Sequence, residues 1–285
     1  SSVLPELPEV ETMCRGIAPC VGTTIKAIHR PRCRLKPIQI RPLIGTLRKK
    51  LYGARIKAIE RVGKRAVLCT NQDTFLVFEP RMTGLLLLSD PPDTEHLRLH
   101  IELTSGGRQR RLQNLLFWDR RGLGTVQLLT ESTYATLCHG GKLGPDALQM
   151  TPALFFQQMG KSRRAIKVAL LDQKLVAGIG NLYAAEILLL AGIHPEQRCL
   201  QLTERDWQNI SRATRRVLRQ AIRYEGSTLG DGTYRNALNK KGRYQNHHRV
   251  YGREGKTCRH CRVGRVKRIV QSQRATFYCP KCQPA

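Results

Sequence analysis

The sequence predicts a multidomain α+β protein, with an N-terminal β-sandwich and N-terminal helix, then a helical domain, then a four-cysteine zinc finger. Three observations predict this. Short β-prone segments separated by turns fill residues 22–129, amphipathic helical patterns follow from about residue 150, and two Cys-x-x-Cys pairs lie beyond residue 257. The 285 residues are enough for two domains of ordinary size.

The excess of positive charge is the strongest bulk signal. Lys and Arg number 49 against 21 Asp and Glu, which gives a formal net charge of +28. Such an excess favours a polyanionic partner, nucleic acid first, while association with ribosomes or a merely basic surface are the alternatives. No apolar run is long enough to span a membrane and no signal-peptide core is present, so we expect a cytosolic protein with no membrane partner.

The first element is a helix that begins near Pro8. Apolar residues recur at the i, i+3, i+4, i+7 spacing of one helical face, at Val10, Met13, Cys14 and Ile17. Pro8 suits the first turn of a helix, and Glu9 and Glu11 lie where the helix dipole favours negative charge. Taken alone, these residues indicate an ordinary acidic helix start.

Pro5 and Glu6, directly before this helix, suggest chemistry. A proline at the start of a chain carries a secondary amine, whose pKa of about 8 leaves part of it unprotonated and able to form a Schiff base. Glu6 could transfer the protons. Ser1–Leu4 precede Pro5, however, and an acylated nitrogen is not nucleophilic. Either Leu4 stands for an alternative start codon that is read as Met and removed, which we expect, or the extension is real and prevents Schiff-base formation.

The predicted β-sandwich domain spans residues 5–140. Four segments are short and β-prone, at residues 24–28, 66–69, 74–78 and 97–103. The last alternates strictly between apolar and polar residues, so one of its faces is expected to be buried. A turn is expected at Ser105–Gly107, and the first helix is expected to pack against the sheets.

A linker over residues 141–149, with the breaker Leu143–Asp146, leads to a helical domain over residues 150–249. Helical patterns span residues 151–159, 164–172, 181–191 and 203–225, and Thr203 with Asp206 approximates a capping box. Residues 226–252 are loop-like and a poor candidate for packed core. They are either a mobile element that orders on substrate or a flexible connector.

The zinc-finger region covers residues 250–285. Two Cys-x-x-Cys pairs separated by 17 residues predict one tetrahedral Zn²⁺ site with the ligands Cys258, Cys261, Cys279 and Cys282. Four thiolates leave no open coordination position, so the ion is expected to be structural. The residues between the pairs predict a β-hairpin whose turn presents Arg274 to a phosphate, although a solvated charge is the simpler interpretation.

A Gly-x-Gly segment, Gly178–Gly180, precedes the helix expected to start near Asn181. The free N–H groups and the positive dipole end of that helix suit a phosphate group. The motif is weak evidence on its own, because many helices start in this way.

Several motifs, in order, resemble the formamidopyrimidine-DNA glycosylase family over nearly the whole chain, from Pro5 to Cys282. Pro5–Thr12 matches the start of the family's processed chain, Pro-Glu-Leu-Pro-Glu-Val-Glu-Thr. Gln273–Tyr278 matches the hairpin of its zinc finger, and residues 174–195 resemble its helix-two-turn-helix, so the resemblance implies a helix-two-turn-helix domain.

The resemblance implies a monomeric DNA glycosylase/AP lyase of base excision repair in the bacterial cytosol or nucleoid. Its partner would be double-stranded DNA that contains 8-oxoguanine, formamidopyrimidines or abasic sites. The damaged base would be flipped out of the stack and excised, and the strand would be cut by β,δ-elimination.

The resemblance also implies roles for individual residues. Pro5 would be the Schiff-base nucleophile and Glu6 would assist proton transfer. The ligands of the DNA backbone would be Lys64, His96, Lys174, Asn181 and Arg274. The gap left by the flipped base would be filled by Met82, Arg121 and Leu123. Without the resemblance, Met82 and Leu123 would be ordinary core residues, and Lys64 and His96 ordinary surface residues.

Residues 119–124 depart from the family pattern at three positions. Arg120 stands where the family usually has Pro, Gly122 replaces a second arginine, and Leu123 replaces Phe. Leucine still serves as an apolar wedge but cannot stack as an aromatic ring does. The preference for the base opposite the lesion is therefore left open.

Two other functions remain alternatives. The endonuclease VIII branch acts on oxidised pyrimidines and usually has Gly where Leu7 stands, which ranks it lower. A non-catalytic binder of damaged DNA is the alternative if Ser1–Leu4 stay attached to Pro5.

Overall fold

The computed structural model describes residues 5–106 and 111–285, which form two compact units. The first unit runs to Gly140 and includes Tyr224–Arg243, and the second consists of Gly141–Arg223 and Tyr244–Ala285. The predicted division differs in three respects, since it assigns residues 224–243 to the helical domain, treats residues 141–149 as a linker and separates residues 250–285 as a zinc finger, whereas the structure places the last two ranges in the second unit. Ser1–Leu4 and Gly107, on which two expectations depend, lie outside the described residues.

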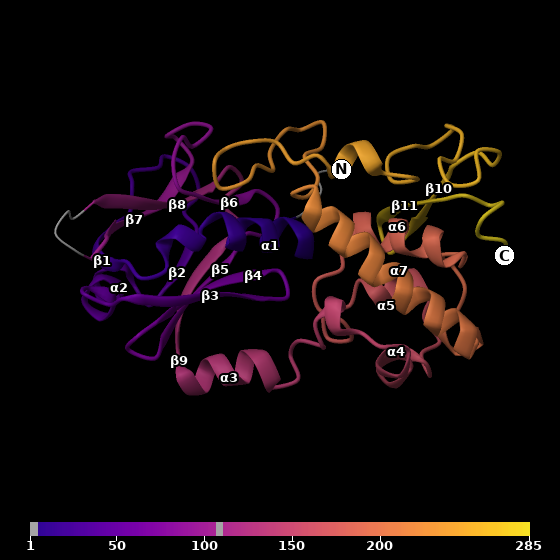
Figure 1. The fold of residues 1–285 in the computed structure, drawn as a ribbon, viewed down its shortest axis with the longest axis horizontal. Coiled ribbons are helices and arrows are strands. Elements are labelled where there is room, and N and C mark those ends of the chain that lie inside the picture. The colour runs from indigo at the N-terminus through magenta and orange to yellow at the C-terminus, as the bar shows by residue number, and fades with distance from the viewer. Residues whose placement is uncertain (1–4, 107–110) are drawn as a thin grey trace. The chain divides into compact units, whose positions relative to one another are not determined.

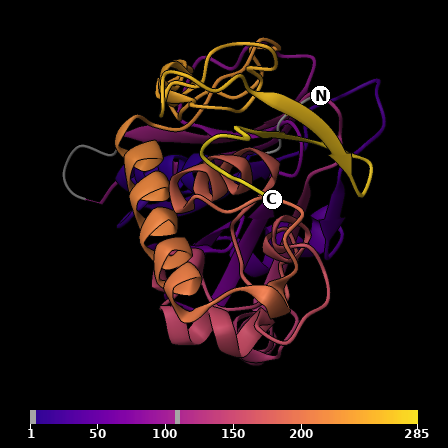
Figure 2. The same ribbon diagram turned by 90° about the vertical axis from the view of Figure 1, so that its right-hand side faces the viewer.

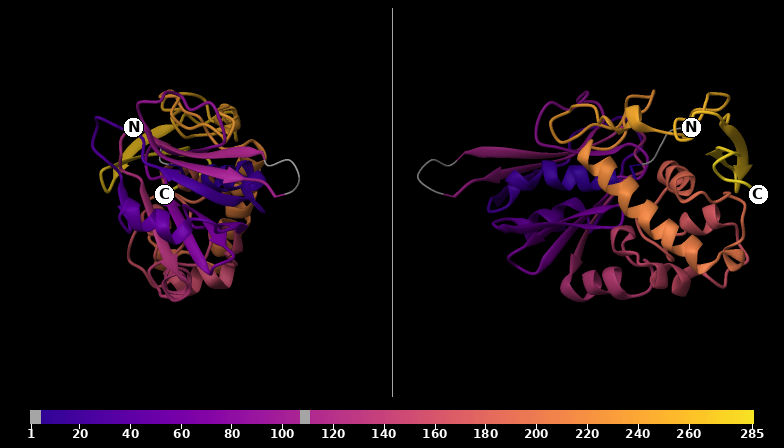
Figure 3. Two further views of the ribbon diagram at one scale, coloured as in Figure 1. Left: turned by 90° about the vertical axis from the view of Figure 1, so that its left-hand side faces the viewer. Right: turned by 45° about the vertical axis from the view of Figure 1, so that its right-hand side comes forward.

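The first unit is built on two β-sheets (Figures 1 and 3). The five-stranded sheet has the order β2 (Gln39–Arg41), β9 (Thr125–Thr130), β5 (Thr74–Glu79), β4 (Arg65–Thr70) and β3 (Ile56–Val62). The four-stranded sheet has the order β1 (Thr24–His29), β7 (Leu97–Thr104), β8 (Leu112–Asp119) and β6 (Gly84–Leu87). Neighbouring strands are antiparallel except β2 and β9.

A single hydrophobic core joins both sheets to helix α1 (Leu7–Gly16). The predicted apolar face of α1 is buried, with Val10, Met13 and Ile17 fully inaccessible to solvent. Burial of each such side chain stabilises the fold by roughly 1.5–3 kcal/mol. The predicted β-sandwich with an N-terminal helix packed on it is confirmed. A 3₁₀ turn, η1 (Ala18–Cys20), follows α1.

Two helices of this unit were not predicted from the sequence. Helix α2 (Ile44–Leu51) lies in a region predicted to be strand-like, and it buries only Leu47 and Leu51. Helix α3 (Glu131–His139) covers the outer face of the five-stranded sheet, where Tyr134 stacks on Phe75 with ring centroids 4.1 Å apart. Both helices are short and bury few side chains, so their helical periodicity is weak in the sequence.

The second unit contains the predicted helices and hairpin (Figure 2). Its helices are α4 (Pro152–Met159), α5 (Ile166–Leu170), α6 (Asn181–Ala191) and α7 (Glu204–Arg223), and its 3₁₀ turns are η2 (Ala147–Gln149), η3 (Cys199–Gln201) and η4 (Tyr244–His247). The hairpin pairs β10 (Lys267–Gln271) with β11 (Arg274–Tyr278). Helix α6 is buried on nearly every side, and it packs against α5, α7 and β11. No helix among the described residues is long and apolar enough to cross a membrane.

The segment Tyr224–Arg243 corrects one prediction. It lacks regular secondary structure, as expected, but it is packed core of the first unit rather than a poor candidate for it. Tyr234 and Ala237 are 6% and 1% exposed and belong to the sandwich core, and the Leu88 N–H donates to the Ala237 carbonyl at 2.9 Å. The partners of this segment lie far away in sequence, which is why its local glycine-rich composition does not predict its burial.

Candidate active site and metal centre

Pro5 and Glu6 are buried at the start of α1. Glu6 is the N-cap residue and forms a reciprocal capping box with Glu9, whose carboxylate accepts the Glu6 N–H at 3.0 Å. The other carboxylate oxygen of Glu9 accepts the Ser227 N–H at 2.9 Å. The carboxylate of Glu9, itself 1% exposed, therefore ties the start of α1 to the segment Tyr224–Arg243.

Close packing at Gly226 supports this link. Gly226 has a φ of +76°, and a Cβ there would lie 2.9 Å from Cγ of Glu9, so the backbone approaches Glu9 only because the residue is glycine. From the sequence, Glu9 is expected only to interact favourably with the dipole of the first helix. The signal for its second role is the three-residue spacing from Glu6, which is that of a capping box.

Lys64 lies in the two-residue turn between β3 and β4, after Gly63, whose φ is +60°. Arg61 ties this turn to α1, because its Nη1 donates to the Gly63 carbonyl at 3.0 Å and its Nε donates to Glu11 at 2.8 Å. Burial alone would raise the pKa of the Glu11 carboxyl, but hydrogen bonds and charge from Arg61 and Arg15 bring that pKa below its ordinary value. Lys64 is thus held at a defined place relative to α1.

Met82 and Arg121 lie together, as the family resemblance implies. Nη1 of Arg121 is 3.1 Å from the Met82 sulfur, and the Arg121 N–H donates to the Thr83 hydroxyl at 2.9 Å. That hydroxyl in turn donates to the buried carboxylate of Asp119. The same carboxylate accepts the Gly124 N–H at 2.8 Å, so Asp119 closes the segment 119–124, which we call the wedge loop. Leu123 lies on this loop and is 37% exposed.

His96 is held beside the wedge loop. Its Nδ1 lies 2.8 Å from Asp93, its ring makes an edge contact with Trp118, and its carbonyl accepts the Asp119 N–H at 3.0 Å. Burial favours a raised pKa for Asp93, but hydrogen bonds from His96 and Trp118 lower that pKa below its ordinary value. Because Asp93 engages Nδ1, the nitrogen available to an outside acceptor is Nε2.

In the second unit, Asn181 is the first residue of α6 and links two other elements. Its Nδ2 donates to the Ala275 carbonyl at 2.9 Å, and its Oδ1 accepts from the Nζ of Lys167, a fully buried lysine on α5. The orientation of the Asn181 side chain is therefore set from both sides. Lys167 is absent from the predicted site residues. Its position in a five-residue helix of otherwise apolar residues is the feature of the sequence that could have indicated it.

Lys174 and Arg274 are both exposed. Lys174 follows α5, and its N–H donates to Asp172 at 3.0 Å. Arg274 is the first residue of β11, directly after the turn at Ser272 and Gln273, both of which have positive φ. This geometry confirms the predicted hairpin and the position of Arg274 at its turn.

The four predicted metal ligands lie together. The sulfur atoms of Cys258, Cys261, Cys279 and Cys282 are all within 4.8 Å of one another. The His260 N–H and the Gly264 N–H point at sulfur atoms, 3.3 Å from Cys258 and 3.2 Å from Cys261. A Cβ at Gly264 would lie 2.5 Å from the Cys279 sulfur, so the backbone closes tightly over the cluster. The cluster could hold one metal ion.

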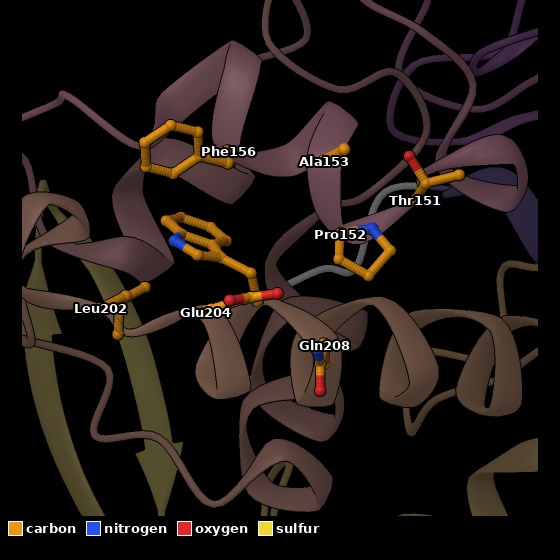
Figure 4. Close-up of a pocket in the computed structure, with 8 residues that line it drawn as sticks. Thr151, Pro152, Ala153, Phe156, Leu202, Glu204 and Gln208 are labelled. Carbon is orange, nitrogen blue, oxygen red and sulfur yellow. The ribbon is translucent and has the colours of Figure 1, made fainter.

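An apolar pocket of about 560 Å³ lies between α4 and the start of α7 (Figure 4). Its walls include Pro152, Phe156, Leu202 and Trp207. None of the site residues predicted from the sequence lines it, so the pocket adds nothing to their chemistry.

Comparison with known proteins decides the family. The model of the formamidopyrimidine-DNA glycosylase N-terminal domain matches residues 4–126, and that of the formamidopyrimidine-DNA glycosylase H2TH domain matches residues 143–232. A formamidopyrimidine-DNA glycosylase of Chloroflexus aurantiacus is 37% identical over 285 residues, 98% of either chain. The chain belongs to the formamidopyrimidine-DNA glycosylase family.

Solved structures of the same family agree with this assignment. Three are complexes of Lactococcus lactis Fpg with DNA that contains Fapy-dG, an abasic site or an oxidised pyrimidine. They match the chain with TM-scores of 0.85, 0.84 and 0.83 at 33%, 32% and 32% identity. The matches cover 98–99% of this chain and 100% of the Lactococcus chains. The chain is thus a DNA-binding glycosylase of DNA repair, and the four-cysteine cluster lies where the sequence predicts the zinc finger.

Proposed function

We propose that this protein is a bifunctional DNA glycosylase/AP lyase that removes oxidised purines, 8-oxoguanine and formamidopyrimidines, from double-stranded DNA. The observation that carries the proposal is the placement of Pro5 and Glu6, both buried at the start of α1 and tied down through Glu9. Family membership and the net charge of +28 support damaged DNA as the substrate. The proposed enzyme acts as a monomer.

Pro5 is the nucleophile once the chain has been processed to begin at that residue. Its nitrogen lone pair attacks C1′ of the damaged nucleotide, and the bond from C1′ to the base breaks as the base leaves with a proton. The departing base takes the proton that the proline nitrogen gives up. The protonated carboxyl of Glu6 donates its proton to the sugar ring oxygen as the ring opens, and the bond between C1′ and the proline nitrogen becomes the cationic Schiff base. Loss of a C2′ proton then expels the 3′ phosphate, and loss of a C4′ proton expels the 5′ phosphate.

Five side chains bind the DNA backbone in this proposal. They are Lys64, His96, Lys174, Asn181 and Arg274. The support is local in each case. Lys64 and Arg274 lie at hairpin turns, Lys174 is exposed, and Asn181 is the first residue of α6, where the helix dipole favours an anion. Asp93 leaves Nε2 of His96 for a phosphate. Lys64 and Arg274 are assigned to the phosphates beside the lesion.

Met82, Arg121 and Leu123 take the space of the flipped nucleotide. The contact between Arg121 and the Met82 sulfur and the exposure of Leu123 support this role. An exposed leucine can enter a base step as an apolar wedge, while Arg121 faces the base that has lost its partner.

The four-cysteine cluster holds one structural Zn²⁺ in this proposal. Thiolates arranged as two Cys-x-x-Cys pairs, with backbone N–H groups donating to sulfur, suit this ion. Four sulfur ligands leave no position for water, so the ion stabilises the hairpin that carries Arg274 and supplies no reactive group.

Borohydride trapping on defined duplexes tests the proposal. Pro5 attack predicts a covalent adduct with duplexes that contain 8-oxoguanine or a formamidopyrimidine. Glu6→Gln should bind these duplexes but lose base excision, whereas Glu131→Gln, an exposed carboxylate on α3, should behave as the unmodified protein does. Unaffected excision by Glu6→Gln would remove Glu6 from its role.

The same assay separates the alternatives. Trapping on oxidised pyrimidine alone would favour an activity like that of endonuclease VIII, and the Lactococcus complex with an oxidised pyrimidine makes this comparison necessary. Binding without any adduct would favour a non-catalytic binder in which Ser1–Leu4 still cap Pro5.

A further inference from the structure

Arg98 is a buried cation at an irregular point of β7. The strict alternation of residues 97–103 places it on the outer, polar face, yet it is only 3% exposed. The register of β7 against β8 shifts between Leu97 and Leu99, so Arg98 is the extra residue of a bulge. A bulge re-aims a side chain, and here it turns the guanidinium away from the solvent.

The guanidinium of Arg98 holds the wedge loop to a second loop. Its Nε donates to the Asp119 carbonyl at 2.8 Å, and its Nη1 donates to the Lys36 carbonyl at 2.7 Å. Burial of a guanidinium costs free energy unless its N–H groups are hydrogen-bonded. The hydrogen bonds to these two carbonyls therefore offset the cost of burying Arg98, and they hold the two loops against its guanidinium. Lys36 belongs to the connection between β1 and β2, which is thereby fixed beside the wedge loop.

The same guanidinium lies against Gly122. A Cβ at position 122 would be 3.1 Å from Nη2 of Arg98 and 2.7 Å from the Lys36 carbonyl oxygen, and the φ of Gly122 is +65°. A larger residue at position 122 is therefore excluded in this conformation, both by contact and by backbone strain. Arg98 fills the space in which a side chain at position 122 would begin. Its contacts lie on both sides of Arg121, at Asp119 and at Gly122.

We propose that Arg98 is a positioning residue that sets the direction of Arg121 and thereby the enzyme's selectivity for the base opposite the lesion. The inference rests on the proposed function, because it requires Arg121 to face that base. Arg98 itself touches neither DNA nor the reacting atoms. It acts by fixing the backbone on either side of Arg121. The Thr83 hydroxyl, which donates to the Asp119 carboxylate, also accepts the Arg121 N–H and holds the wedge loop at a separate point.

The experiment compares Arg98→Met with the unmodified protein on four duplexes that differ only in the base opposite 8-oxoguanine. Methionine keeps the length of the side chain but loses both hydrogen bonds. We expect the spread of kcat/KM across the four opposing bases to shrink by about fivefold or more. Arg48→Met is the matched control, since Arg48 on α2 also donates from Nε to a carbonyl, that of Ile28 at 2.7 Å, and it should leave the spread unchanged.

A single-stranded oligonucleotide with an abasic site has no opposing base, so borohydride trapping on it reports the nucleophile alone. Trapping there by Arg98→Met within about twofold of the unmodified protein shows an intact fold and nucleophile. If the unmodified protein traps nothing, the proposed function fails. If it traps but Arg98→Met keeps the full spread of selectivity, or if the unmodified protein shows no spread, the inference about Arg98 is overturned.

Gly122→Ala tests the same inference if Arg98→Met does not fold. The added Cβ would lie 2.7 Å from the Lys36 carbonyl oxygen and 3.1 Å from Nη2 of Arg98, so the contacts between Arg98 and the wedge loop must shift. Reduced selectivity in this variant supports the positioning role. Full selectivity in a folded Gly122→Ala protein contradicts it.

Discussion

Replacement of Glu9 by glutamine perturbs the link that holds Pro5 and Glu6 in place. The two oxygens of the Glu9 carboxylate accept the Glu6 N–H at 3.0 Å and the Ser227 N–H at 2.9 Å, and the side chain is 1% exposed. Glutamine offers one oxygen and one NH₂ group, so one of the two N–H donors would face another donor. A lost hydrogen bond to a charged, buried acceptor costs about 1.5–3 kcal/mol.

For a unit of this size, a loss of that order lowers Tm by roughly 3–12 °C, because 1 kcal/mol corresponds to about 2–4 °C. The assay is a thermal melt together with borohydride trapping on an abasic-site duplex below the melting range. We expect a lower Tm and a slower trapping rate, since Glu6 loses its backbone anchor. A Glu9→Gln protein that melts within about 1 °C of the unmodified protein and traps at the same rate would refute this account of the site.

Three further predictions follow from other contacts. Glu11→Gln should lower Tm at pH 7 by about 2–4 °C, the equivalent of about 1 kcal/mol. The pKa of Glu11 is lowered in the folded state from its ordinary value of 4.5. The stabilisation by its carboxylate is therefore present above that value and disappears as the pH falls through the folded pKa, so the difference in Tm between the two proteins should close in melts from pH 7 to pH 3. Lys167→Met should weaken binding to an abasic-site duplex by about tenfold without changing the salt dependence of binding, because buried Lys167 orients Asn181 and neutralises no phosphate. Arg274→Ala should instead reduce the slope of log K against log salt by about one. Equal slopes in the unmodified protein and in both variants would contradict these different roles of Lys167 and Arg274. Cys279→Ser should lower the zinc content, measured by metal analysis, from the expected one ion per chain. It should also weaken DNA binding, measured by titration. Full DNA affinity in a protein without zinc would contradict the role of the four-cysteine cluster.

Local sequence patterns were sufficient for the elements that repeat one period over several residues. The alternation of residues 97–103 predicts β7, and the helix expected at residues 181–191 coincides with α6. Helix α2 was not predicted, because eight residues that bury only two side chains have little helical periodicity in the sequence. The burial of the segment Tyr224–Arg243 was not predicted, because it depends on partners far away in the sequence, as in the hydrogen bond from Ser227 to Glu9, 218 residues apart.

The same distinction applies to the site. Pro5, Glu6 and the four cysteines belong to short motifs whose chemistry depends on neighbours in the sequence. Arg98 and Lys167 act through groups that the fold brings to them, two backbone carbonyls in one case and Asn181 in the other. The alternation of β7 even places Arg98 on the wrong face, because a bulge is a property of the strand pair and not of one strand.

The attacking atom is the central claim, and mass mapping of the trapped complex tests it most directly. The complex with an abasic-site duplex would be reduced with borohydride, digested with nuclease and protease, and sequenced by mass spectrometry. We predict that the deoxyribose remnant is attached to the nitrogen of Pro5, in a peptide that begins with Pro-Glu-Leu-Pro. A remnant on a lysine side chain, or on a chain that still begins with Ser1, would contradict the account.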